Sequence, residues 1–334
     1  MKIAACYTIY NEEEYLACSV RSIYDGVDKI IICLGLAPWS AYNPSVRTTF
    51  RQRDRTEAIV DQLAQGDDKV LVKKGVWDSE VAQRNAAMQA CVDEGIEHYF
   101  LVDGDEVYRR DHLQAIREEI ERHPEVGTFQ IKCTVLWRSF RYRIPYWGVQ
   151  WTPWRIFKVS RSRPMLGLRL PYRCQFTGPN RTNSLSPRYL IPPDKAIFYH
   201  LGYARSTERM RLKMAASEQQ HHFVQGWLED VWMRWPQHRS MKNLQPLDPE
   251  GLPEAFCVDP SDLPEVMRTH PYWAWTLSRN PPTPWSRFVN PRMTPQKHRG
   301  DTEPQRALDG KFSVSLWNSV PSVVWTGIYE MDPW

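Results

Sequence analysis

Three carboxylates, Asp103, Asp105 and Glu106, stand close together at the end of an apolar run, Tyr99–Val102. Carboxylate oxygens are the ligands that Mg²⁺ and Mn²⁺ prefer, and these cations usually bind one or two carboxylates together with substrate phosphates. The alternative is an Asp-Gly hairpin turn with solvated carboxylates. The pattern therefore indicates either a metal and phosphate site at a strand end or an ordinary acidic turn.

Strand-like runs alternate with amphipathic helical stretches in the first 125 residues. We expect strands at Ile3–Ile9, Lys29–Leu34, Val70–Val72 and Tyr99–Val102. This alternation is typical of an α/β, Rossmann-like fold with a mainly parallel sheet and crossover helices. In such a sheet the strand ends face the ligand crevice, which is where the carboxylates stand.

Polar residues at helix starts suggest the helix boundaries. Asn11 can cap a helix in a capping box with Glu14, and Ser79 and Asp111 can cap later helices. Ser206 can cap a long helix that continues as far as Val231.

Two further strands are expected later in the chain. Thr128–Trp137 alternates apolar and polar residues, which predicts a single strand with one buried face, and Ile197–His200 predicts another short strand.

Tryptophan and proline divide the chain unevenly, since two of fifteen Trp and three of twenty-six Pro precede residue 131. We expect a Rossmann-like half at 1–125, a second half at 126–235, and an irregular Trp/Pro-rich extension at 236–334. Prolines recur too often after residue 236 for regular elements.

The net charge of +4 is too small to indicate nucleic-acid binding. Its distribution is uneven, because residues 126–193 contain twelve Lys or Arg and no Asp or Glu. We refer to residues 126–193 as the basic segment.

The seven cysteines are scattered and form no CxxC pair, which predicts free thiols in a reducing compartment. The first residues lack the pattern of a secretory signal, and the longest late uncharged run, Phe312–Tyr329, is too polar for a membrane span. We therefore expect a cytoplasmic protein.

Several short motifs occur in the order seen in glycosyltransferases of family 2, and the sequence resembles that family over residues 1–215. The matching pieces are Asn11-Glu12-Glu13 after the first strand, Asp54-Arg55-Thr56, Gln83-Arg84-Asn85, the DxD-like Asp103-Gly104-Asp105, and His200-Leu201-Gly202-Tyr203 followed by Arg205 and Lys213. The resemblance implies a GT-A fold in which residues 1–125 form the half that binds a nucleotide-sugar donor, and residues 126–235 form the acceptor-side half with the metal-ligand His and the long helix.

The resemblance also implies roles for individual residues. Asp103, Asp105 and His200 would hold Mn²⁺ or Mg²⁺, His200 as a neutral imidazole. The donor would be bound by Asn11, Glu13, Asp54, Arg84, Asn85, Asp103, Arg205 and Lys213. Read from the residues alone, His200 is a core histidine, Asn11 a helix cap, Arg84 an exposed partner of Glu80, and Lys213 a solvated helix lysine.

The catalytic base of inverting family members would fall within the basic segment, which has no carboxylate. Asp194, Glu208 and Glu106 are the base candidates from outside it. A retaining mechanism would need no such base.

The sequence therefore predicts a metal-dependent glycosyltransferase that acts on an acceptor hydroxyl. The basic segment favours an anionic glycan or a lipid-linked acceptor, with peripheral association at the inner membrane surface; the alternative is a basic surface that pairs with the acidic remainder of the same chain. The alternatives are a nucleotidyltransferase and a non-catalytic carbohydrate-binding protein that uses the Trp-rich C-terminal region.

Overall fold

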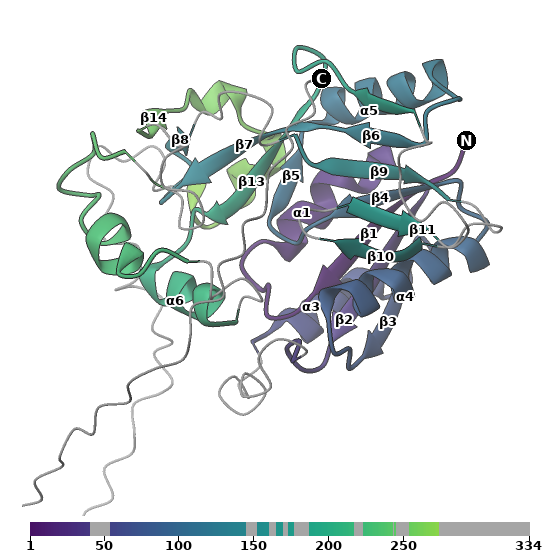
Figure 1. The fold of residues 1–334 in the computed structure, drawn as a ribbon, viewed down its shortest axis with the longest axis horizontal. Helices are drawn as coiled ribbons and strands as arrows, with labels where there is room; N and C mark the ends of the chain where they lie inside the picture. The colour runs from purple at the N-terminus through teal and green to yellow at the C-terminus, as the bar shows by residue number, and fades with distance from the viewer. Residues whose placement is uncertain are drawn as a thin grey trace, which may run out of the picture. The chain divides into compact units, whose positions relative to one another are not determined.

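The computed structural model describes residues 1–40, 54–144, 152–159, 165–169, 173–176, 187–216, 223–242, 244 and 254–273. Its largest sheet has seven strands in the order β12-β6-β9-β4-β1-β2-β3 (Figure 1). These strands are β1 (Ile3–Ile9), β2 (Lys29–Gly35), β3 (Val70–Gly75), β4 (His98–Val102), β6 (Thr128–Gln130), β9 (Trp154–Lys158) and β12 (Arg188–Leu190).

The four N-terminal strands of this sheet, β1 to β4, are mutually parallel, whereas β9 runs antiparallel to β4 and β6. The mixed α/β architecture with a mostly parallel sheet confirms the predicted fold class. The four strands predicted in the first 125 residues are all present, and β2, β3 and β4 are one to three residues longer than predicted.

A second sheet of five strands has the order β14-β8-β7-β13-β5, and a separate hairpin pairs β10 with β11. These strands are β5 (Glu106–Tyr108), β7 (Lys132–Trp137), β8 (Tyr142–Ile144), β10 (Met165–Arg169), β11 (Arg173–Phe176), β13 (Ile197–Tyr203) and β14 (Phe256–Cys257). The prediction of one strand over Thr128–Trp137 is wrong. The chain changes sheets at Ile131, so the alternating run supplies β6 to one sheet and β7 to the other.

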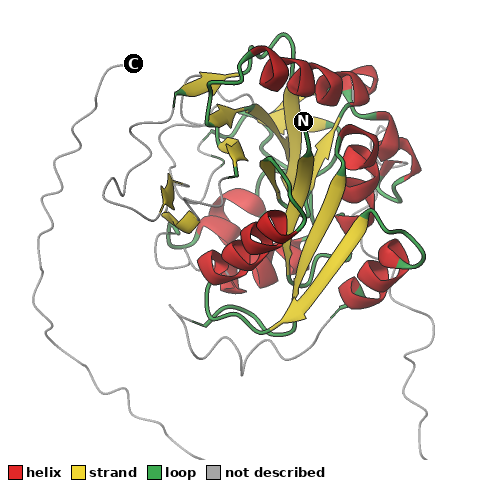
Figure 2. Cartoon of the chain, turned by 90° about the vertical axis from the view of Figure 1, so that its right-hand side faces the viewer, coloured by secondary structure: helices red, strands yellow, loops and turns green. Residues whose placement is uncertain are grey.

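Helices cover both faces of the seven-stranded sheet (Figure 2). They are α1 (Leu16–Ile23), α3 (Thr56–Ala64), α4 (Glu80–Asp93) and α5 (Arg110–Arg122), and α6 (Thr207–Ala216) follows β13. Alternate residues of β1 separate the two layers: Tyr7 packs in the cluster that includes α1 and α5, and Cys6 packs in the cluster that includes α4. The sheet is therefore the middle layer of three.

The predicted helix caps have mixed outcomes. Ser79 caps α4 by accepting from the Ala82 backbone N–H, as predicted. Asp111 does not cap α5, whose N-cap residue is Arg109. Asn11 does not cap α1 either, because α1 begins at Leu16 and Asn11 has a left-handed φ of 51°.

The stretch after β13 is helical in two separate pieces. Ser206 caps α6, since its hydroxyl accepts from the Arg209 backbone N–H at 2.8 Å. A single helix as far as Val231 is wrong, because residues 223–226 are not helical and a separate π-helical turn follows at Leu228–Trp232. That turn packs Trp232 edge-on against Trp137 of β7, with ring centroids 5.0 Å apart.

The described part of the C-terminal extension, residues 236–242, 244 and 254–273, contains only β14 and two short 3-10 turns, Pro260–Asp262 and Glu265–Thr269. The six cysteines whose side chains are described are free thiols. Among the described residues, no helix combines the length and apolar character that crossing a bilayer requires.

Candidate active site

The loops after β1 and β4 form an acidic edge of the seven-stranded sheet. Tyr7 lies opposite Val102 in the parallel pair of β1 and β4, so both strands end at the same edge. Residues 11–14 follow β1 and residues 103–106 follow β4. The carboxyl ends of parallel strands are where open α/β sheets bind their ligands.

Gly104 allows the two acidic loops to touch. A Cβ at residue 104 would lie 2.6 Å from Glu12 Cγ and 2.8 Å from Ile9 Cδ1, closer than carbon atoms can approach. The residue between the two aspartates must therefore lack a side chain, which explains the glycine of the DxD-like motif.

Two arginines hold Asp103. Arg84 of α4 donates to its Oδ1 at 2.7 Å, and Arg155 of β9 approaches its Oδ2 at 3.4 Å. Although burial raises the pKa of Asp103, the two guanidinium groups lower it to about 2. Arg84 also pairs with Glu80, as expected, but it is buried rather than exposed. Asn85, the next residue of α4, is half-buried.

Asp105 faces three basic side chains. Its Oδ2 accepts from Arg205 and from Lys213, each at 2.9 Å, and its Oδ1 lies 3.4 Å from His200 Nε2. Burial raises the pKa of Asp105, but Lys213, His200 and Arg205 hold it well below its usual range. The structure thus brings together these four predicted site residues, and the imidazole of His200 is 26% exposed rather than enclosed in a core.

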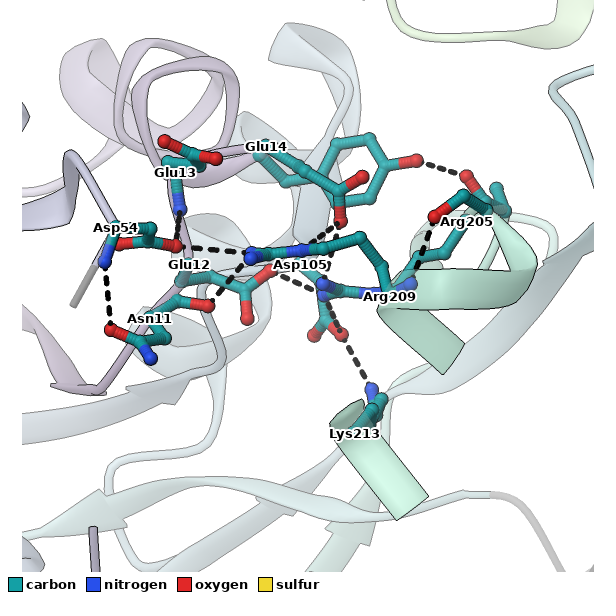
Figure 3. Close-up of polar contacts among 12 residues, drawn as sticks. Asn11, Glu12, Glu13, Glu14, Asp54, Asp105, Arg205, Arg209 and Lys213 are labelled. Carbon is teal, nitrogen blue, oxygen red and sulfur yellow. Dashed lines mark hydrogen bonds and ion pairs between the residues drawn. The ribbon is translucent and has the colours of Figure 1, made fainter. Parts of the chain in front are cut away.

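One face of α6 carries the cations that meet this acidic edge. Arg205, Arg209 and Lys213 recur every four residues, so they line one side of the helix and of the turn before it. Figure 3 shows the three side chains pointing at the loops after β1 and β4. Glu14 Oε2 accepts from both arginines, at 2.9 Å from Arg205 and 3.3 Å from Arg209.

Asn11 and Asp54 lie together beside this face. Asn11 Oδ1 accepts from the Asp54 backbone N–H at 3.3 Å, and Asp54 Oδ2 accepts from the Glu13 backbone N–H and from Arg209. The carboxylate of Glu13 instead pairs with Arg55. This contact between loops 43 residues apart accounts for the left-handed backbone of Asn11.

Two carboxylates of this edge, Glu12 and Glu106, have a raised pKa, in each case chiefly through burial. Burial raises the pKa of Glu12 to about 7, and Asp105 adds to the effect, whereas Arg205 and Lys213 oppose it. Glu12 pairs with Arg205. Near neutral pH these two glutamates therefore bind a proton more readily than Asp103 and Asp105 do.

The three base candidates lie in different surroundings. Glu106 is fully buried and pairs with Arg155, and its Oε2 accepts from the Tyr108 hydroxyl at 3.1 Å. Asp194 is exposed in the turn before β13, at the opposite end of that strand from Gly202. Glu208 is exposed in the first turn of α6.

Of the three predicted metal ligands, Asp105 and His200 lie close together, whereas both carboxylate oxygens of Asp103 face arginines. Two ligand atoms 3.4 Å apart can share one cation, and Mg²⁺ or Mn²⁺ commonly takes few protein ligands and completes its shell with phosphate and water. A Cβ at Gly202 would lie 2.6 Å from His200 Cε1 and 2.8 Å from Lys213 Nζ. The absence of a side chain at residue 202 therefore lets His200 and Lys213 both reach Asp105. No group of three or more His, Cys, Asp or Glu among the described residues is arranged as a metal site. The residues present fit a cation that the substrate helps to bind.

Sequence reasoning missed four contributors to the site: Glu12, Glu14, Arg155 and Arg209. A signal for Arg209 was available, because it falls midway between Arg205 and Lys213 on one helix face. Arg155 carried no such signal, since it lies on a strand 52 residues from Asp103.

The comparison with known families identifies the class of protein that these residues form. A family model described as glycosyl transferase family 2 matches residues 50–185, which include Arg84, Asp103 and Asp105. The match confirms the resemblance drawn from the motifs, and the chain is a glycosyltransferase.

Solved structures give weaker likenesses. A crystal structure of S. aureus TarS 1-349 is 14% identical with a TM-score of 0.39, over 72% of this chain and 73% of that one. A second S. aureus TarS structure is 15% identical with a TM-score of 0.38, over 72% of this chain and 48% of that one. A 4-diphosphocytidyl-2C-methyl-D-erythritol synthase from Anaerococcus prevotii is 14% identical with a TM-score of 0.28, over 47% of this chain and 70% of that one. No curated protein matches the chain.

Proposed function

We propose that this glycosyltransferase depends on a divalent cation and moves a sugar from a nucleotide-diphosphate donor to an acceptor hydroxyl. The observation that carries the proposal is Asp105, which faces Arg205, Lys213 and His200 at the ligand-binding edge of a parallel sheet. A carboxylate and an imidazole suited to a cation stand beside two cationic side chains suited to phosphates. The family match favours transfer of a sugar over nucleotidyl transfer or simple carbohydrate binding.

In the proposed reaction the bond between the sugar's anomeric carbon and the diphosphate oxygen breaks. A bond to the acceptor oxygen forms, the acceptor hydroxyl loses its proton, and the nucleoside diphosphate leaves. A bound cation offsets the charge on this leaving group. Lys213, whose side chain is 40% exposed, can turn from Asp105 to a phosphate, while Arg205 and Arg209 stay fixed by Glu14.

The other predicted donor residues lie near Arg205, Arg209 and Lys213, where we propose that the diphosphate binds. We propose that Asn11, Glu13 and Asp54 face the nucleoside, because they lie together in the loop contact beside Arg209. We propose that Asp103 contributes charge and holds Arg84, since both of its oxygens face guanidinium groups.

For an inverting reaction we propose Glu208 as the first base candidate to test. It is exposed next to the basic face of α6, whereas Glu106 is buried in an ion pair and Asp194 lies at the far end of β13. Glu208→Gln should then lower kcat, with Asp194→Asn as the matched control. If neither substitution lowers kcat, a retaining mechanism is favoured.

We propose an anionic acceptor, either an acidic glycan or a lipid-linked precursor at the inner membrane surface. The support is the basic segment, in which Arg143, Lys158 and Arg188 are exposed. Arg155 is excluded from this role, because its guanidinium is committed to Asp103 and Glu106.

The test is to incubate the full chain with a panel of nucleotide sugars, with Mn²⁺ or Mg²⁺ and with chelator. Slow donor hydrolysis that requires metal is expected even without an acceptor. Donor turnover that is unchanged by chelator would contradict metal dependence, and failure to bind every nucleotide sugar would contradict the donor class.

A further inference from the structure

A short segment near the C-terminal end of the described chain packs against the start of α1. We call residues 260–272 the strap. Its Leu263 and Met267 are buried in one apolar cluster with Tyr15, Phe140 and Leu201. The strap therefore packs against Tyr15, the residue that joins the loop after β1 to α1.

The end of the strap contacts Glu14 twice. The Tyr272 hydroxyl donates to Glu14 Oε1 at 2.7 Å, and His270 Nε2 lies 2.8 Å from the Glu14 carbonyl oxygen. His270 Nδ1 accepts from the Tyr272 backbone N–H, so Nε2 carries the proton and donates to the carbonyl. The His270 ring also stacks on Tyr15, with centroids 5.1 Å apart.

The two carboxylate oxygens of Glu14 have different partners. Oε1 faces Tyr272, whereas Oε2 accepts from Arg205 and Arg209. Glu14 is 6% exposed, so water contributes little to holding this carboxylate. The χ3 torsion of a glutamate side chain has a broad range of favourable angles. A hydrogen bond to one carboxylate oxygen therefore fixes the orientation of the whole carboxylate, including the second oxygen.

We infer that Tyr272 is a positioning residue of the donor site, which acts through Glu14 to hold Arg205 and Arg209 toward the acidic edge. The inference rests on the proposed function, in which Arg205 faces the donor phosphates and Arg209 lies beside the residues proposed for the nucleoside. It assigns a role in donor binding to a residue 258 positions away from Glu14, in the Pro-rich extension.

The test is Tyr272→Phe in the full chain, which removes the hydroxyl and keeps the ring. Tyr189→Phe is a closely matched control: the Tyr189 hydroxyl also donates at 2.7 Å to a buried glutamate, Glu119, that pairs with two basic residues away from the donor edge. Both variants should lose similar thermal stability. Only Tyr272→Phe should raise the donor KM, by about three- to tenfold, with kcat changed less than about twofold.

A second measurement separates positioning from general loosening. In a Glu14→Gln background, where the carboxylate is absent, adding Tyr272→Phe should change the donor KM by less than about twofold. Equal donor KM values in the two tyrosine variants, or an undiminished effect of Tyr272→Phe in the Glu14→Gln background, would overturn the inference. If the wild-type chain turned over no nucleotide sugar, the proposed function itself would be the part that failed.

Discussion

Replacing Asp105 by Asn tests the centre of the proposed site. The substitution keeps the size of the side chain but removes the charge that faces Arg205, Lys213 and His200. Removing one preorganised electrostatic contribution to a reaction costs about 2.7–4 kcal/mol, which corresponds to a loss of about 10²–10³-fold in rate. We expect transfer to fall by at least about a hundredfold in kcat/KM.

The loss of folding stability should be smaller than the loss of activity. Arg205 keeps Glu12 and Glu14 as partners, and Lys213 can be solvated at its exposed side. We therefore expect a destabilisation of about 1–3 kcal/mol, which is a shift of a few degrees in the melting temperature. Asp105 also contributes to the raised pKa of Glu12, so the substitution should move a Glu12-dependent pH profile toward lower pH.

The assay is donor turnover of the Asp105→Asn chain at saturating metal, together with thermal unfolding. Asp28→Asn is the control, because Asp28 is also a carboxylate that pairs with an arginine, Arg117, but it directly precedes β2 and accepts from the Ile3 backbone N–H, away from the acidic edge. If Asp105→Asn kept turnover within about tenfold of wild type, the electrostatic reasoning would be refuted.

Three further outcomes are expected. Gly202→Ala should raise the metal concentration needed for donor binding by about tenfold, because its Cβ would crowd His200 and Lys213; an unchanged titration would argue against a cation between Asp105 and His200. Burial lowers the pKa of His98 from 6.5 to about 4, so the folded chain disfavours its protonated form. This preference contributes about 3 kcal/mol to the free energy of unfolding, a contribution that is complete above pH 6.5 and is lost as pH falls toward 4. Chemical denaturation at these two pH values should show a smaller change in unfolding free energy for His98→Asn than for wild type. Equal changes in the two proteins would contradict the role of His98. If the basic segment binds an anionic acceptor, the acceptor KM should rise with ionic strength and with Arg143→Glu while donor binding stays normal, and insensitivity to both would contradict the anionic acceptor.

The strands were predictable because burial dictates their composition. β1, β2 and β4 are runs of apolar residues enclosed between helix layers, and such runs appear in the sequence without knowledge of their partners. The break at Ile131 was not predictable in this way, since alternation continues across it while the chain moves to another sheet.

The local rules for helix caps failed where another partner competed for the side chain. Asn11 has the residue type of a helix cap, yet its side chain binds the Asp54 backbone in another loop. Asp111 likewise has a capping residue type but pairs with the guanidinium of Arg109. The cap of α6 by Ser206 was predictable, because its partner lies three residues ahead.

The candidate site was predictable to the extent that its residues sit in recognisable motifs. Asp105, His200, Arg205 and Lys213 were named from the family resemblance, and their side chains lie together. Arg155 belongs to a segment whose excess positive charge suggested a surface for the acceptor. Its position beside the carboxylates of Asp103 and Glu106 depends on the pairing of β9 with β4, which no local pattern encodes.

The basic residues that pair with the acidic edge are synthesised at different times after the carboxylates. Arg155 follows Glu106 by 49 residues, and Lys213 follows Asp105 by 108. At ordinary translation speeds the second interval lasts about 5–20 s, during which the first strands can already pair. Asp103 already has Arg84 by then, but Asp105 and Glu14 lack their arginine and lysine partners until residues 205–213 are made, so the completed site is among the last parts of the described chain to form.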